Sequence, residues 1–173
     1  MSGPPPPQRV PADVHAAGSS CEEVMRLLEA TIERASSFTE DERHRRVNDE
    51  WSTVESLRHI VMVVDGWLGR TIKGEPDPFH PIGLPPHFAP RVLPGSSIDP
   101  DADPTFEEAC EVLRGRLQTL AAFVDGLTNG EHARDIGTHA KTVAGGLGVI
   151  FDELTFHNFF INRDLSVIEQ ERV

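Results

Sequence analysis

The stretch Ile150–Ile168, IFDELTFHNFFINRDLSVI, decides the fold of this chain. Its large apolar side chains recur at spacings of three and four residues, which places them along one side of a helix. This stripe contains Leu147, Phe151, Leu154, Asn158, Ile161, Leu165 and Ile168. A second stripe beside it contains Ile150, Glu153, His157, Phe160 and Asp164. We therefore predict one long amphipathic helix.

Glu153 and His157 lie one turn apart in this helix, next to the core-facing stripe. A carboxylate and an imidazole at positions i and i+4 can point at one metal ion or share one proton. In an isolated E-x-x-x-H, a partly solvated Glu–His pair is the commoner structure. The pair alone therefore does not separate a metal site from an ordinary surface contact.

Length and charge limit the classes of function. A chain of 173 residues is most simply one domain with a continuous core. Its 28 acidic and 16 basic residues give a net charge of −12, which repels nucleic-acid phosphates. No apolar run approaches the ~18 residues of a membrane span, and the amino terminus lacks the pattern of a signal peptide. We expect a cytoplasmic protein that binds neither nucleic acid nor membrane. Cys21 and Cys110 lie in apolar helical patterns and are expected to be free thiols.

The amino-terminal part of the chain should contain a tail and a first helix. Residues 1–18 are proline-rich and are expected to form a flexible tail, so that the single folded domain spans 19–173. The first helix should run from a cap at Ser19 or Ser20 to about Ser37.

The middle of the chain should contain two more helices. One starts at the capping box formed by Ser52 and Glu55, is apolar nearly all round, and stops near Gly74. The other starts near Thr105, with acidic residues in its first turn. The last helix should begin around Thr142. Polar connections are expected over 39–50 and 128–142. Gly145, Gly146 and Gly148 are best explained by close approach of a neighbouring helix, because no lysine follows them in the pattern of a phosphate-binding loop.

Residues 75–104 contain nine of the fourteen prolines, which excludes a helix or a central strand. A loop of this length in a compact domain is usually functional or a lid. It also contains His80 and His87. The alternative is a structural strap, and we favour a strap that can also cover a site. The apolar residues expected to hold it down are Phe79, Ile82, Leu84 and Phe88.

Four amphipathic helices and no convincing strand predict an all-α protein, specifically a four-helix bundle. Helices of ~20 residues are ~30 Å long, and the crossover over 75–104 is long enough to span that length. The second and third helices can therefore run parallel. This gives an up-down-down-up order.

Several short motifs follow one another between residues 50 and 170. They are Trp51-Ser52 with Glu55 and His59, Asp65-Gly66-Trp67-Leu68, HPIGLPP at 80–86, Asp152-Glu153, His157-Asn158 and Arg163-Asp164-Leu165. In this order and spacing they resemble the DinB/YfiT-like metalloenzymes, in particular the DinB-type branch common in actinobacteria. The resemblance implies an up-down-down-up bundle.

The resemblance also implies a divalent metal bound by three histidines, one on the second helix and two on the last. His59 matches the first ligand and His157 the last, whereas Glu153 stands where the middle histidine usually lies. Two histidines and one carboxylate form a catalytic zinc set. Zinc is favoured here, with nickel, iron or manganese as alternatives. Asp164 could orient a ligand, although a pair with Arg163 is the simpler interpretation.

The implied activity is that of related thiol-dependent transferases and isomerases, which use low-molecular-weight thiols such as mycothiol or bacillithiol. We therefore expect a metal-dependent enzyme, a thiol S-transferase or a hydrolase, that forms a homodimer. No residue apart from the ligands stands out as catalytic. The alternative is a non-catalytic dimeric bundle that acts as a binding or interaction protein with a decayed metal site.

Overall fold

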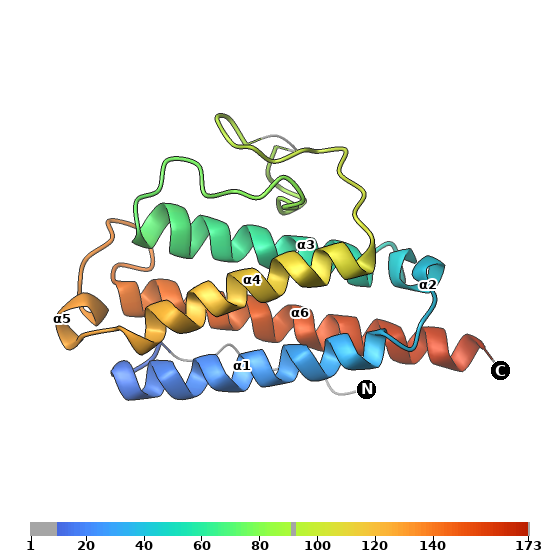
Figure 1. Ribbon diagram of the computed structural model, residues 1–173, viewed down its shortest axis with the longest axis horizontal. Coiled ribbons are helices and arrows are strands. Elements are labelled where there is room, and N and C mark those ends of the chain that lie inside the picture. Colours follow the sequence, from blue (N-terminus) through green and yellow to red (C-terminus); the bar gives the residue numbers. More distant parts are fainter. Residues whose placement is uncertain (1–9, 91–92, 173) are drawn as a thin grey trace.

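The computed structural model describes residues 10–90 and 93–172, in which the regular secondary structure is helical and no strand is formed. The elements are α1 (Val14–Ala35), α2 (Glu40–His44), α3 (Thr53–Val64), the π-helical segment η1 (Asp65–Ile72), α4 (Phe106–Asp125), α5 (Asn129–His132) and α6 (Val143–Glu171). The predicted all-α class is confirmed. The long helices α1, α3, α4 and α6 lie side by side, and α3 and α4 run opposite to α1 and α6 (Figure 1). Both α3 and α1 pack against α4 and α6.

Side-chain caps fix where these helices begin. Ser52 and Thr105 each form a capping box with the glutamate three residues later, and Thr142 accepts a hydrogen bond from the backbone N–H of Gly145. The predicted starts of α3, α4 and α6 are therefore confirmed. A third capping box, between Thr39 and Glu42, starts the short helix α2 inside a segment predicted to be a plain connection.

The predicted start of the first helix is wrong. Asp13 caps α1 by accepting the N–H of Ala16, so the helix begins at Val14 and not after Ser19 or Ser20. The alanines that follow Asp13 favour a helix, and Ala17 is already buried in the core. Residues 14–18 therefore belong to the helix, while residues 1–9 of the predicted tail lie outside the described residues.

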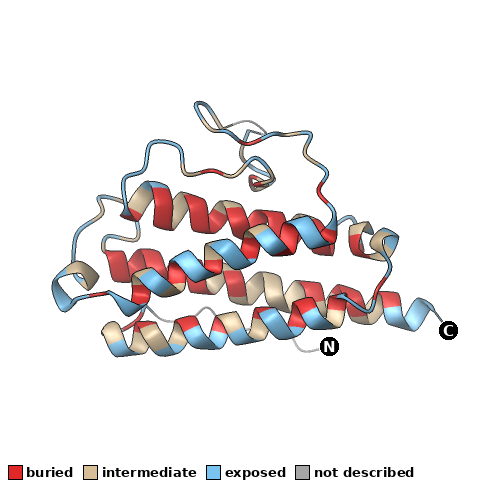
Figure 2. Ribbon diagram, viewed as in Figure 1, coloured by how far each residue is buried: buried red, intermediate tan, exposed pale blue. Residues whose placement is uncertain are grey.

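The core lies between the four long helices (Figure 2). The apolar members of the predicted α6 stripe are all buried: Leu147, Phe151, Leu154, Ile161, Leu165 and Ile168. Its one polar member, Asn158, accepts a hydrogen bond of 2.6 Å from the Thr31 hydroxyl on α1, and Thr31 in turn accepts one from Asn162. Cys21 and Cys110 are buried free thiols, as predicted.

The helix that starts at Ser52 changes its hydrogen-bonding pattern half-way. After Val64 it continues as η1, and its last bonds skip one residue more than an α-helix does, for example from Lys73 N–H to the Leu68 carbonyl. Gly74, with φ of +74°, then ends the helix at the predicted place.

The proline-rich segment 75–104, here called the strap, crosses the outer side of α3 (Figure 1). Its described residues form no helix or strand, as predicted. Polar groups of α3 and η1 hold the strap: Arg58 Nε donates to the Ile82 carbonyl, and Asp65 accepts the N–H of His80. Phe79 is buried, but Phe88 is 93% exposed. The prediction that Phe88 anchors the strap is therefore wrong. The hydrogen bonds from Arg58 and to Asp65 hold the strap instead.

Candidate metal centre

The three predicted ligands come together between α3 and α6. His59 projects from α3, and Glu153 and His157 project from adjacent turns of α6, with one ligand atom of each within 4.8 Å of the others. Glu153 Oε2 lies 3.8 Å from His59 Nε2 and 3.6 Å from His157 Nε2. Ligand atoms bound tetrahedrally at ~2.1 Å from one zinc ion are about 3.4 Å apart. The two measured distances are therefore close to those of a ligand set.

A backbone carbonyl of the strap orients His59. Its Nδ1 lies 2.8 Å from the Leu84 carbonyl oxygen, which can only accept a hydrogen bond, so Nδ1 carries the proton. The lone pair of the neutral ring is then on Nε2, the atom that faces Glu153. Metal-bound histidines are held in this way by a hydrogen bond from the other ring nitrogen. His59 is also buried, since only 5% of the residue is exposed.

Glu153 and His157 have charge states that suit metal binding. The close imidazoles of His157 and then of His59 lower the pKa of Glu153 to about 2, so this carboxylate is ionised at neutral pH. Burial lowers the pKa of His157, which keeps its imidazole neutral. Nδ1 of His157 is buried and has no hydrogen-bond partner in the described part of the chain. Packing therefore orients this ring where hydrogen bonding does not.

Trp51 supplies that packing. Its ring centroid lies 5.7 Å from that of His157 in a stacked arrangement and 4.5 Å from that of His59. A cavity of about 370 Å³, here called the metal cavity, opens on the three candidate ligands. Its walls include Trp51, Met62, Val63, Trp67 and His87. The candidate ligands thus have one open side, and most of its walls are apolar.

A family model described as the DinB superfamily matches residues 6–158. The chain belongs to the DinB superfamily. The match covers most of the chain and ends one residue after His157, so it includes all three candidate ligands. The searches of curated proteins and of solved structures found no match. None of the helices within the described ranges has both the length and the apolar character that crossing a membrane requires.

Other candidates of this DinB-superfamily chain lie away from the three ligands. Asp164 accepts a hydrogen bond of 2.7 Å from Arg163 Nε, the simpler of the two sequence interpretations. His80 lies at the Asp65 end of the strap, where its backbone N–H binds that carboxylate. Neither is in the group that could bind a metal.

Sequence reasoning missed two contributions of the strap. The carbonyl of Leu84 orients His59, and the ring of His87 contacts that of Trp51 in a tilted arrangement with centroids 4.3 Å apart. A backbone carbonyl leaves no mark in the sequence. His87 was noticed as a histidine in a long loop, but nothing in an aperiodic segment indicates which way a side chain points.

Proposed function

We propose that this protein is a divalent-metal-dependent enzyme whose ion is bound by His59, Glu153 and His157. The observation that carries the proposal is the convergence of three ligand atoms from α3 and α6 at a cavity with an open side. Catalytic zinc sites have three protein ligands and one position left for water or substrate. Zinc is the favoured ion, and the carboxylate oxygen also admits nickel, iron or manganese.

The reaction that this site supports best is thiol S-transfer, with hydrolysis as the second candidate. A bound divalent ion would supply a deprotonated thiol or an acidified water at its open position. The residues of the chain orient the ligands and shape the cavity, since Leu84 fixes the His59 tautomer while Trp51 and Met62 form an apolar wall. A low-molecular-weight thiol is the proposed co-substrate. The proposal also takes the four long helices as an up-down-down-up bundle, in which α3 packs against α6.

Metal content tests the proposal. Protein purified without an affinity tag should contain about one divalent ion per chain, measured by mass spectrometry. His59→Ala and His157→Ala should each weaken zinc binding by more than ~100-fold, because loss of a ligand exceeds the 10–100-fold effect of losing an outer-shell partner. Glu153→His should retain binding and favour softer ions over manganese.

The matched control is His15→Ala, which removes an exposed imidazole at the start of α1. It should leave zinc affinity unchanged. Protein that stays metal-free when zinc is offered, with unchanged stability in all the variants, would contradict the proposal. That result would favour the alternative, a non-catalytic binding or interaction protein with a decayed site.

A further inference from the structure

Arg58 immediately precedes His59 on α3 but lies on the wall of a second cavity. Only 7% of this residue is exposed. Its Nε donates to the Ile82 carbonyl at 2.8 Å, whereas Nη2 is buried without any hydrogen-bond partner in the described part of the chain. Burying a charge without a partner is strongly unfavourable. A buried guanidinium with an unused nitrogen therefore needs an explanation.

The carboxylates nearest to Arg58 do not satisfy it. Glu55, Asp99 and Asp103 attract the guanidinium electrostatically, but Arg58 forms no ion pair with any carboxylate in residues 10–90 and 93–172. Burial lowers the pKa of Arg58, yet a guanidinium remains protonated at neutral pH. The guanidinium on the wall of this cavity thus has no direct carboxylate partner among the described residues.

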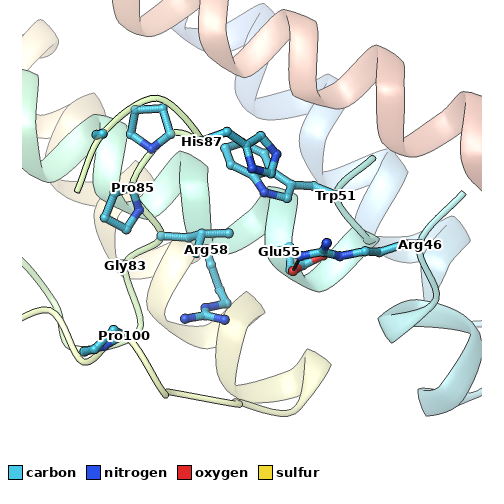
Figure 3. A pocket seen from close by; sticks show the side chains of 11 residues that line it. Arg46, Trp51, Glu55, Arg58, Gly83, Pro85, His87 and Pro100 are labelled. Carbon is cyan, nitrogen blue, oxygen red and sulfur yellow. Dashed lines mark hydrogen bonds and ion pairs between the residues drawn. The ribbon is translucent and has the colours of Figure 1, made fainter. Parts of the chain in front are cut away.

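The second cavity, here called the Arg58 cavity, has a volume of about 310 Å³. In Figure 3, Arg58 lies between the strap residues Gly83 and Pro85 and the ion pair of Arg46 with Glu55. That pair is internally balanced, because Arg46 Nε donates to Glu55 at 2.9 Å and its Nη2 binds the other carboxylate oxygen. Of the two arginines on the wall, only Arg58 is left for a ligand.

The Arg58 cavity adjoins the metal cavity. Both are lined by Trp51, Pro86 and His87. The indole of Trp51, which contacts the rings of His59 and His87 in tilted arrangements, is therefore shared by the two cavities. A ligand that reached from one cavity to the other would pass along this ring.

We propose that the Arg58 cavity is a carboxylate-binding subsite, in which Arg58 binds the carboxylate of a ligand whose other end lies in the metal cavity. Nε is already used by Ile82 and Nη2 is covered in the free chain, so a planar anion binds the two terminal nitrogens as a fork only after the guanidinium turns toward the cavity. A singly charged carboxylate suits a cavity that also contains Glu55 better than a doubly charged phosphate does. That the ligand is a substrate rests on the proposed function, whereas carboxylate binding itself does not.

Nuclear magnetic resonance of the two tryptophan indoles tests the subsite on the full chain after removal of metal with a chelator. Trp51 lines both cavities, whereas Trp67 lines only the metal cavity. Benzoate should shift the Trp51 indole resonance in a saturable way and leave that of Trp67 in place. Benzamide, its neutral counterpart of similar shape, should shift neither. A Trp67→Phe variant assigns the two resonances.

Arg58→Gln should raise the benzoate dissociation constant at least about tenfold, because a hydrogen bond to a charged partner is worth a decade of affinity or more. Arg58→Lys should give an intermediate loss, since it keeps the charge without the fork. Arg114→Gln is the control, as it removes the same charge from an exposed pair with Glu29 on another helix. It should not change the dissociation constant.

The proposal is overturned by no saturable shift, by equal binding of benzamide, by equal shifts of both indoles, or by a shift that survives in Arg58→Gln. If loss of the Ile82 contact unfolds the Arg58 variants, the comparison of benzoate with benzamide in the wild-type protein still tests the proposal. Metal binding is measured separately. If the protein binds no metal but still binds benzoate at Trp51, the proposed function is contradicted and the carboxylate subsite is not.

Discussion

At the scale of single residues, the carboxylate of Asp65 is a buried and doubly hydrogen-bonded group outside the candidate metal centre. Only 4% of this residue is exposed, and each of its oxygens has a partner from a different element. Arg116 on α4 binds one oxygen, and the backbone N–H of His80 on the strap binds the other at 2.9 Å. Burial raises the pKa of Asp65 in spite of these contacts. The carboxylate therefore depends on Arg116 to stay ionised.

Arg116→Met should destabilise the protein by about 3 kcal/mol at neutral pH, because it leaves a buried carboxylate without its counter-ion. The measurement is urea denaturation. The stranded carboxylate takes up a proton when the pH falls below its raised pKa, so the difference from the wild type should shrink on acidification. Arg114→Met is the matched control, since Arg114 pairs with Glu29 at the surface and such pairs contribute about 0–1 kcal/mol. Equal losses in the two variants would show that burial of Asp65 is unimportant.

At the scale of elements, the start of α6 depends on residues without a side chain. A Cβ atom on Gly145 would lie 1.9 Å from the carbonyl oxygen of Ala140, and one on Gly146 would lie 3.2 Å from the Ile72 side chain of η1. The predicted close approach of a neighbouring helix is found at Gly146, whereas Gly145 meets a turn. The neighbours are the turn before α6 and the end of η1, and both follow from the tertiary fold.

Gly145→Ala should therefore lower the free energy of unfolding by about 1–3 kcal/mol, because a backbone carbonyl cannot move aside as a flexible side chain does. Gly115→Ala is the opposite case. Gly115 is exposed in the middle of α4 with nothing within 4 Å of an added Cβ, so alanine should stabilise the helix by about 0.5–1 kcal/mol. Thermal denaturation of the two variants should give shifts of opposite sign, and shifts of the same sign would contradict this account.

The elements also show how far the sequence determines the structure. Caps and apolar periodicity are local, so the starts of α3, α4 and α6 were predictable from Ser52, Thr105 and Thr142. The cap at Asp13 was overlooked because two serines nearby offered an equally plausible start. The change to η1 has no local pattern that distinguishes it from a continuing α-helix.

The candidate site could be predicted from the sequence to a similar extent. Spacing on one helix brought Glu153 together with His157, and the family resemblance added His59, which the structure places within reach of both. The strap contributions could not be predicted, because the contact of Leu84 with His59 and the unpartnered nitrogen of Arg58 depend on the path of an aperiodic segment.

At the scale of the whole molecule, α6 has more apolar surface than the other long helices cover. Between Val143 and Ile168 it has no exposed residue, yet Phe156, Phe159 and Phe160 remain partly accessible in the single chain. A shallow cavity of about 430 Å³ lies on this side, lined by Phe159 and Val167 of α6 and by Arg34 of α1. An apolar face of this kind is typical of a surface that pairs with another copy.

We expect a homodimer with two-fold symmetry, in which α6 packs against its counterpart. Sedimentation at micromolar concentration should give the mass of two chains, and Phe159→Glu should give the mass of one. Phe88→Glu changes the fully exposed phenylalanine of the strap in the same way. It should leave the dimer intact. If Phe88→Glu were monomeric while Phe159→Glu stayed dimeric, the interface would lie on the strap and not on α6.

The double hydrogen bonding of Leu84 links the strap to the timing of metal exchange. The N–H of Leu84 donates to the Arg58 carbonyl and its carbonyl accepts from His59, so one strap residue holds both α3 and a candidate ligand. If an ion is bound by the three candidate ligands, a turn of the His59 ring would help to release it, and the hydrogen bond to Leu84 opposes that turn. Small local openings of a fold are far more frequent than its global unfolding. The residence time of an ion would therefore be set by how often this short piece of loop lifts from α3, and a protein could hold its metal tightly yet still exchange it without unfolding.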